Sequence, residues 1–205
     1  MPKRKKSAKP TLFEIVEAQE GLFTAKQAEE AGFDKRNHSY HVRAGNWIRE
    51  HRGIYRLAHF PRSPHEQYAL WSLWSRGRDD QPQGVYSGQT ALSLHELSDV
   101  MPAKLHMSVP RSFRRNSKLP RAIVLHHDDL PAADCIEMRG FRVQRPLAAI
   151  ASLFETEEVS EDILRQAIQE GLRRGLITLS EIKNPKLPSV LREKIREWLK
   201  QRAVA

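Results

Sequence analysis

Side chains of the types that read base edges follow one another between residues 35 and 43. The run is KRNHSYHVR, in which an arginine and an asparagine are adjacent. An arginine can form two hydrogen bonds to guanine and an asparagine two to adenine, and each such pair contributes roughly 1–3 kcal/mol of discrimination. We expect Arg36 and Asn37 to contact bases, unless this is an ordinary solvated helix face. The same polar side is predicted to hold Lys35, His38, His41 and Arg43, with Lys35, His38 and Arg43 at phosphates.

Arginines recur in the next two short segments. Residues 47–49 and 54–57 alternate or run apolar like strands, and the connection between them, Glu50-His51-Arg52-Gly53, contains the glycine that a tight hairpin favours. A basic hairpin directly after a reading helix is typical of a wing. We expect Arg49, Arg52 and Arg56 to lie on or near it, within reach of phosphates or of a minor groove.

Imidazole and carboxylate side chains, which are ligands for divalent ions, stand together in His126-His127-Asp128-Asp129. Neighbouring residues of a strand point to opposite faces, so this run cannot close around one ion without a turn and further ligands. We therefore interpret it as the end of a strand that continues into a polar loop, and we expect no metal site and no cofactor.

A loose nuclease pattern is formed by Asp134, Glu137 and Arg139. Metal-dependent nucleases use spaced carboxylates with a lysine, and an arginine, which keeps its charge, transfers protons poorly. We do not expect the chain to be an enzyme, although a metal-dependent nuclease stays open as an alternative.

The elements that must position the reading residues form a helix-turn-helix. Apolar spacing predicts a helix from Thr11 to Gly21, and Thr24 with Gln27 forms a capping-box pattern for a second helix that ends at Gly32. Asp34 is placed to cap a third helix over residues 35–44, the reader, which ends before a glycine. Within it, Tyr40 and Val42 are expected to face inward.

The rest of the chain predicts a second, mixed domain. Residues 59–64 are expected to be a linker, and the helix at 65–76 is expected to place Trp71 and Trp74 in a core. Strands are expected at 105–109, 122–126, 136–138 and 141–144, and helices at 89–97, 147–154, 161–174 and 190–202, with a further turn capped by Ser180. A basic loop, Arg111-Ser112-Phe113-Arg114-Arg115-Asn116, separates the first two of these strands.

Composition limits the class of protein. The net charge is +9 over 205 residues, and the excess lies at the two ends: residues 1–62 hold 13 basic and 7 acidic side chains, residues 63–82 hold 2 and 3, residues 83–160 hold 9 of each, and residues 161–205 hold 10 and 6. Cys135 is the only cysteine, which excludes an intrachain disulfide and a cysteine-based zinc cluster. Without an apolar run long enough for a membrane span, we expect a cytoplasmic protein.

The fold class predicted is therefore α+β. Residues 1–10 are expected to be a basic disordered arm, which could follow a DNA groove or serve as a solubilising tail. Residues 11–62 are expected to be a winged helix-turn-helix DNA-binding domain. Residues 63–205 are expected to be an α/β domain with a small sheet, ending in basic helices.

The stretch GLFTAKQAEEAGFDKRNHSYHVRAGNWIREHRGIYRL resembles the winged-helix segment of the AbiEi family, antitoxins of type IV toxin–antitoxin systems. The later stretches SGQTALSLHEL, MPAKLHMSVP, VLHHDDL and GFRVQRPLAAIASLFE are similar, in order and spacing, to the family's second domain. Together they cover roughly residues 11–155.

This resemblance implies a bacterial protein with two activities. Its first domain would bind double-stranded DNA at the operator of its own operon and repress it, with Lys35, Arg36, Asn37, His38, His41 and Arg43 on the recognition helix and Arg52 on the wing. Its second domain would counteract a nucleotidyltransferase-like toxin without forming a stable complex. A standalone winged-helix regulator whose second domain binds a ligand or dimerises is the other alternative that the residues leave open.

Overall fold

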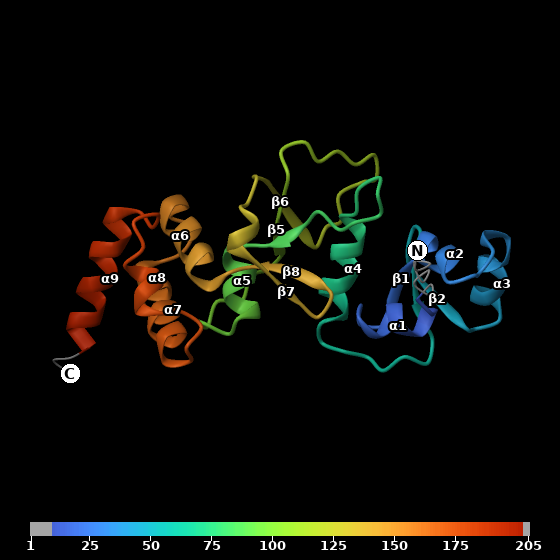
Figure 1. The fold of residues 1–205 in the computed structure, drawn as a ribbon, viewed down its shortest axis with the longest axis horizontal. Coiled ribbons are helices and arrows are strands. Elements are labelled where there is room, and N and C mark those ends of the chain that lie inside the picture. The colour runs from blue at the N-terminus through green and yellow to red at the C-terminus, as the bar shows by residue number, and fades with distance from the viewer. Residues whose placement is uncertain (1–9, 203–205) are drawn as a thin grey trace, which may run out of the picture. The chain divides into compact units, whose positions relative to one another are not determined.

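The computed structural model describes residues 10–202 (Figure 1), so the basic arm predicted for residues 1–10 lies, apart from Pro10, outside the described residues. The chain forms two compact units. The first runs up to Gln83 and also includes Glu137–Phe141, and the second comprises Gly84–Ile136 and the chain from Arg142 onward. The first unit thus extends beyond residue 62, where the sequence predicted its end.

The first unit has the element order of a winged helix. Its small sheet has the strand order β1-β3-β2, with both pairings antiparallel. The elements are α1 (Leu12–Glu17), β1 (Leu22–Thr24), α2 (Ala25–Glu30), the 3-10 turn η1 (Lys35–Asn37), α3 (His38–Arg43), β2 (Trp47–His51), β3 (Ile54–Leu57) and α4 (Glu66–Trp74). Strand β1, which completes the sheet, was not predicted.

The helices begin where the capping residues predict. Thr24 caps α2: its hydroxyl accepts a hydrogen bond from the backbone N–H of Gln27, and the Gln27 side chain accepts one from the Thr24 N–H, at 3.1 and 2.8 Å. Thr11 forms the equivalent box with Glu14 at α1. Asp34 caps the third segment through the N–H of Arg36. Its first turn is 3-10, so the α-helix begins only at His38.

Aromatic side chains form the core between the helices and the wing. Trp47 lies at its centre, 3% exposed, with Phe23 packed edge-on at a centroid distance of 4.9 Å and Phe33 at 5.4 Å. Of the tryptophans of α4, Trp74 is buried as predicted, whereas Trp71 is only partly buried. The prediction that Tyr40 faces inward is wrong, because its side chain is 60% exposed.

The second unit is built around a five-stranded sheet with the order β6-β5-β4-β8-β7, of which only the residues where β7 turns into β8, Glu137–Phe141, are counted with the first unit. The elements are β4 (Val85–Tyr86), α5 (Gly88–Leu94), β5 (Leu105–Val109), β6 (Ile123–His127), η2 (Ala132–Asp134), β7 (Cys135–Met138), β8 (Phe141–Gln144), α6 (Pro146–Thr156), α7 (Glu161–Arg173), α8 (Leu179–Ile182) and α9 (Ser189–Arg202). With sheets and helices in both units, the predicted α+β class is confirmed. Helix α8 is capped by Thr178 and not by Ser180, because the Thr178 hydroxyl accepts from the N–H of Glu181.

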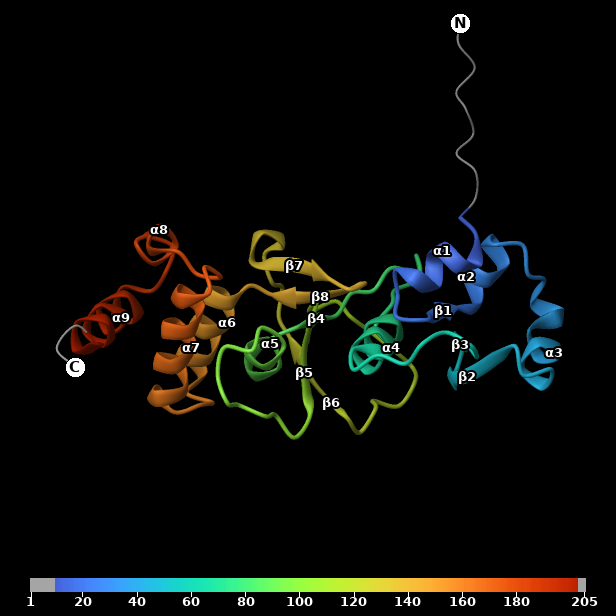
Figure 2. The same cartoon turned by 90° about the horizontal axis from the view of Figure 1, so that it is seen from below.

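Two pairs of adjacent strands in this sheet are parallel, and the antiparallel pair of β4 and β5 lies between them. Strand β5 runs parallel to β6, and β4 runs parallel to β8, whereas β4 and β5 are antiparallel. Figure 2 shows the strands in the order β7, β8, β4, β5 and β6. A parallel pair requires the chain to return along the whole strand before the second strand begins. Residues 110–122 make this return between β5 and β6 without a helix.

A buried polar network joins the sheet to α5 and α6. The Gln144 side chain accepts a hydrogen bond from the N–H of Gly88 at 3.2 Å and donates one to the Ser152 hydroxyl at 3.0 Å. The Nε2 atom of His95 lies 2.9 Å from the carbonyl oxygen of Gln144.

At the C-terminal end, the buried Trp198 of α9 donates its indole N–H to Glu161 of α7 at 2.9 Å.

Candidate nucleic-acid interface

Helix α3 is fixed to the wing through its two histidines. The His41 ring stacks on the Trp47 indole, with centroids 4.6 Å apart and planes inclined by 20°, and the His38 ring lies 5.2 Å from the same indole. Since Trp47 begins β2, both imidazoles connect the predicted reading helix directly to the first strand of the wing. The helix is therefore held at a defined position against the hairpin.

His38 is part of the core. It is 4% exposed, and its Nε2 atom lies 3.2 Å from the carbonyl oxygen of Phe33, the residue of the turn before the helix. The prediction that His38 contacts phosphate is wrong for this structure, because the side chain has no surface to offer. His41, predicted on the DNA side, is partly buried with its ring on Trp47, so we leave both residues out of the proposed interface.

The outward side of the segment carries the remaining predicted residues and one that was missed. The Arg36 side chain is 88% exposed, and Tyr40 and Arg43 follow it at the i, i+4, i+7 spacing of one helical face. Tyr40 was expected to face inward, although its spacing from Arg36 and Arg43 can be seen in the sequence. The exposed side chains of the segment are Lys35, Arg36, Asn37, Ser39, Tyr40 and Arg43.

Arg36 is oriented by the residue that caps the segment. Its guanidinium forms a two-pronged ion pair with the Asp34 carboxylate, with Nη2 2.7 Å from Oδ2 and Nε 3.1 Å from Oδ1. The same hydrogen bonds lower the pKa of Asp34 from its ordinary value, and the backbone N–H of Arg36 lowers it further. Arg36 thus projects into solvent in one preferred direction, with hydrogen-bond donors left for another acceptor.

The wing divides its arginines between surface and core. Arg49 and Arg52 are exposed, as expected for phosphate contacts, and Gly53 takes the positive φ of +68° that the hairpin turn requires. Arg56 is 2% exposed, so the prediction that it reaches phosphate is wrong. Its Nε lies 3.1 Å from Glu66 of α4, and its other nitrogens donate to the carbonyl oxygens of Leu57, Ala58 and Phe60.

The positive charge of the first unit is local. Residues 10–62 hold eight basic and seven acidic side chains, but residues 35–57 alone hold six basic residues and a single acidic one, Glu50. Exposed carboxylates lie instead on the first two helices, at Glu14, Glu17, Glu29 and Glu30. A polyanion would therefore be attracted to the α3 and wing surface and repelled from α1 and α2.

The two candidate metal sites do not assemble. Strand β6 ends at His127 and continues into a loop, as predicted; His126 Nε2 lies 3.1 Å from His106 Nδ1, while Asp128 and Asp129 lie 3.7 and 3.9 Å from Arg111. Within residues 10–202, no group of three or more His, Cys, Asp or Glu side chains is arranged to hold a metal ion. Arg139 of the nuclease pattern pairs with Glu20 at 3.6 Å.

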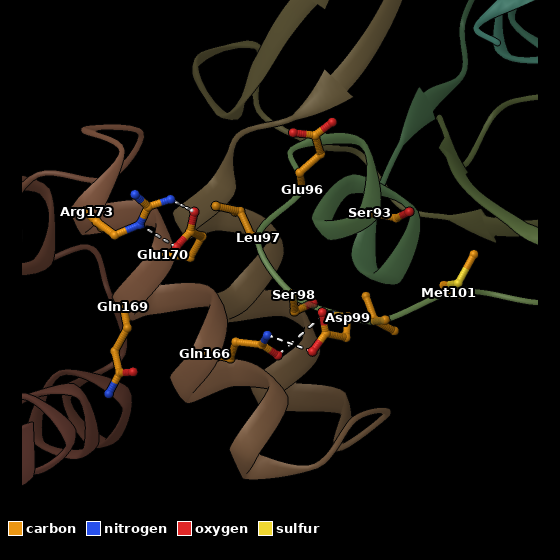
Figure 3. A pocket seen from close by; sticks show the side chains of 11 residues that line it. Ser93, Glu96, Leu97, Ser98, Asp99, Met101, Gln166, Gln169, Glu170 and Arg173 are labelled. Carbon is orange, nitrogen blue, oxygen red and sulfur yellow. Dashed lines mark hydrogen bonds and ion pairs between the residues drawn. The ribbon is translucent and has the colours of Figure 1, made fainter.

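The second unit also has an open groove of about 640 Å³ between the end of α5 and α7 (Figure 3). Four of its polar side chains are paired, since Gln166 donates to Asp99 at 3.0 Å and Arg173 binds Glu170 through two nitrogens. The buried hydroxyl of Ser98, which also lines the groove, has no hydrogen-bond partner. Glu96 lies 3.7 Å from Arg174. Most of the charged side chains of the groove are thus already paired.

Comparison with known proteins finds a family match within the first unit. Residues 10–58 match the family model described as "Transcriptional regulator, AbiEi antitoxin", which confirms the resemblance over the winged helix. No curated protein matches the chain significantly. The crystal structure of the RV2827C protein from Mycobacterium tuberculosis is similar over 72% of this chain and 66% of that one, with 14% identity and a TM-score of 0.44. In the described part of the chain, no helix is long and apolar enough to cross a membrane.

Proposed function

We propose that the chain is a sequence-specific DNA-binding repressor of its own operon and the antitoxin of a type IV toxin–antitoxin system. The observation that carries the DNA-binding part is the exposed basic face of α3, η1 and the wing, held rigidly by Trp47. The match of residues 10–58 to an antitoxin and regulator family supports both parts.

In this mechanism the segment from Lys35 to Arg43 enters the major groove. Arg36 and Asn37 pair with base edges, and Lys35 and Arg43 contact phosphates on either side. Arg49 and Arg52 of the wing contact the backbone or the adjacent minor groove. Because His38 and His41 fix the helix to the strand that bears Arg49, the two contact surfaces bind as one rigid body.

The antitoxin activity is assigned to the second unit and involves no catalytic step or cofactor. Its support is the similarity of residues 87–155 to the second domain of the antitoxin family, and its partner is a nucleotidyltransferase-like toxin that it counteracts without a stable complex. Co-expression of the chain with the adjacent open reading frame tests this part. Restored growth of cells that express the neighbouring protein supports it, and unchanged toxicity overturns it.

Titration of the upstream DNA of its own operon, against a scrambled duplex of equal length, tests the DNA-binding part. We expect tighter binding to the upstream DNA, and we expect the double variant Arg36→Ala, Asn37→Ala to lose this preference while it retains binding to both duplexes. Arg62→Ala, which removes an exposed arginine outside the interface, is the control. Equal affinity of the unmodified protein for both duplexes would exclude sequence-specific repression.

A further inference from the structure

A groove in the first unit is lined mostly by apolar side chains and has no role in the function proposed above. It has a volume of about 550 Å³ and lies between α1 and the chain that follows β3. Phe13 and Glu17 line it from α1, and Leu57, Phe60 and Pro61 line it from the end of β3 onward. Pockets for small molecules have volumes of roughly 300–1,000 Å³ and combine an apolar surface with a few polar groups. This groove, which we call the α1 groove, therefore has the size and composition of a small-molecule site.

Phe13 presents an aromatic ring to the α1 groove. Its side chain is 61% exposed, whereas Leu12 and Val16 of the same helix are buried in the core. A second ring placed against Phe13 would remove apolar surface of both rings from water, and offset or edge-on ring pairs are stabilised further. The exposed ring therefore favours a ligand with an aromatic body.

The wall formed by residues 57–61 is fixed before any ligand binds. The buried guanidinium of Arg56 donates hydrogen bonds to the carbonyl oxygens of Leu57, Ala58 and Phe60. The Phe60 ring lies against Gly21, where an added Cβ atom would come within 2.6 Å of it. A wall that is already ordered reduces the entropy that a ligand must offset on binding.

Glu17 gives the α1 groove a negative charge. Its side chain is exposed, and within residues 10–202 its carboxylate takes part in no ion pair. Among the described residues, no lysine or arginine lines the groove. The carboxylate therefore attracts a cationic ligand and repels an anionic one.

The spacing of Phe13 and Glu17 limits the length of that cation. The two residues are four apart on one face of α1, so their Cβ atoms are about 5–6 Å from each other. A ligand whose ring contacts Phe13 reaches Glu17 when a short linker separates the ring from an ammonium group. Asn46 and His59, which also line the groove, offer further hydrogen-bonding groups.

Asn46 connects the α1 groove to the DNA-binding surface. It lies between α3 and β2, and its backbone N–H donates to the carbonyl oxygen of His41 at 3.0 Å. Its carbonyl oxygen accepts a hydrogen bond from the N–H of Ala58, also at 3.0 Å. A ligand that contacts Asn46 thus stabilises the arrangement of the reading helix and the wing, and two such binding events strengthen each other by the same factor.

We propose that the α1 groove binds an aromatic monoamine, with its ring against Phe13 and its ammonium group at Glu17, and that the bound amine strengthens DNA binding. The amine site is independent of the proposed function, whereas the effect on DNA rests on it. The ligand class follows from three features of the groove, namely its apolar lining, its exposed ring and its unpaired carboxylate.

The test compares two probes that share an indole ring and differ in charge. Tryptamine carries an ammonium group, and indole-3-acetate carries a carboxylate. Isothermal titration calorimetry with the full chain measures both affinities without DNA. We expect tryptamine to bind more tightly by about five-fold, the upper range for one exposed ion pair. Absence of tryptamine binding, or equal affinity for both probes, overturns the inference.

Matched variants assign this preference to the α1 groove. Glu17→Gln should give both probes the same affinity, whereas Glu29→Gln, which removes an exposed carboxylate of α2 outside the groove, should keep the preference. Phe13→Ala should weaken both probes by a similar factor, and circular dichroism should show an unchanged fold because the ring is exposed. A preference that survives Glu17→Gln, or that Glu29→Gln also removes, overturns the inference.

A second copy of the chain is the competing occupant of the α1 groove. Analytical ultracentrifugation of the original chain and of Phe13→Ala distinguishes the two. The same oligomeric state in both proteins supports a small-molecule site. A dimer that Phe13→Ala converts to a monomer makes the groove an interface between copies and overturns the inference.

DNA titration with and without saturating tryptamine tests the coupling. We expect the amine to raise the affinity of the original chain for its upstream DNA by at least about five-fold. The Glu17→Gln variant should show no change, which controls for direct effects of the amine on DNA. Unchanged or weaker DNA binding by the original chain overturns the coupling.

The outcome is separable from that of the proposed function, because the calorimetric measurement contains no DNA. If the chain prefers its upstream DNA but does not distinguish the two probes, only the amine site fails. If the chain binds tryptamine as expected but shows no preference for its upstream DNA, the sequence-specific repressor fails and the amine site stands.

Discussion

The imidazole of His41 stacks on the indole of Trp47, with centroids 4.6 Å apart and planes inclined by 20°. This contact joins the helix that carries the candidate reading residues to the first strand of the wing. Its neighbour Tyr40 points the other way and is 60% exposed. These two adjacent residues of α3 therefore have different roles. His41 fixes the helix to the wing, and Tyr40 faces the solvent where DNA is proposed to bind.

The first prediction separates these two tasks by single substitutions. His41→Ala removes the ring contact with Trp47 and should lower the free energy of unfolding by about 1 kcal/mol. Tyr40→Ala should change stability by less than about 0.5 kcal/mol but weaken DNA binding. Urea unfolding and DNA titration of both variants measure the two effects, and an equal loss of stability would contradict the assignment.

The second prediction concerns the buried ion pair of Arg56 with Glu66. Arg56→Ala leaves the carboxylate of Glu66, which is 13% exposed, without its buried partner, and should cost about 3–5 kcal/mol of unfolding free energy. Arg62 also contacts Glu66, at 2.6 Å, but is 66% exposed. Arg62→Ala should therefore cost no more than about 1 kcal/mol. Urea denaturation midpoints of the Arg56→Ala and Arg62→Ala variants measure the two costs. A similar loss of stability in both variants would contradict the prediction that burial makes the Arg56 pair more important.

The third prediction compares two capping threonines. Thr24 is fully buried, and besides capping α2 it donates its hydroxyl to Asp80 at 2.6 Å. Thr11 caps α1 at an exposed position. Thr24→Ala should cost about 2 kcal/mol and Thr11→Ala about 0.5–1 kcal/mol. Thermal unfolding monitored by circular dichroism checks the order, which fails if Thr11→Ala is the more destabilising change.

The fourth prediction is a loss of stability in mild acid. Burial lowers the pKa of His95 and of His106 from the ordinary 6.5, with Arg174 lowering the first further and His126 the second, while a hydrogen bond from His95 to Gln144 and the charge of Glu158 oppose these shifts. The unfolded chain therefore binds more protons just below pH 6.5 than the folded chain does. The stabilisation is complete above that pH and decreases as pH falls toward the folded pKa values.

Urea unfolding at pH 7.5 and 5.5 measures this loss. The variant His95→Gln removes one of the two shifted groups and should show a smaller difference between the two pH values. His59→Gln, an exposed histidine of the first unit, should show the same difference as the original chain. Equal stability of the unmodified protein at both pH values would contradict the prediction.

Local signals in the sequence were sufficient for most elements of the fold. Thr24 with Gln27, and Asp34 ahead of the reading segment, marked the helix starts because a capping interaction involves residues only two or three apart. The parallel pairing of β5 with β6 could not be predicted, because it depends on contacts between residues 18 apart, such as Leu105 with Ile123. Strand β1 was missed since three residues carry no measurable periodicity.

The sequence predicted the position of the candidate site correctly, but it placed two buried residues on the surface of that site. Arg36, Asn37 and Arg43 lie on the surface as expected, whereas His38 and Arg56 are buried. Polarity alone suggested exposure for both. Their burial is compensated by partners that the sequence does not place beside them, the Phe33 carbonyl for His38 and Glu66 for Arg56.

The discontinuous first unit limits how this DNA-binding module could be engineered. The Tyr68 ring lies 5.6 Å from the ring of Phe141, centroid to centroid. Phe141 belongs to the first unit but follows most strands of the second sheet in the sequence. A fragment that ends at residue 62 would lack Glu66, so the buried Arg56 would have no carboxylate partner. A fragment that ends at residue 83 would contain Glu66 but would still lack Phe141. A fusion of the winged helix to another protein would therefore need α4 and a side chain that replaces the Phe141 ring. The winged helix cannot be separated from this chain as one continuous fragment with all of its packing contacts.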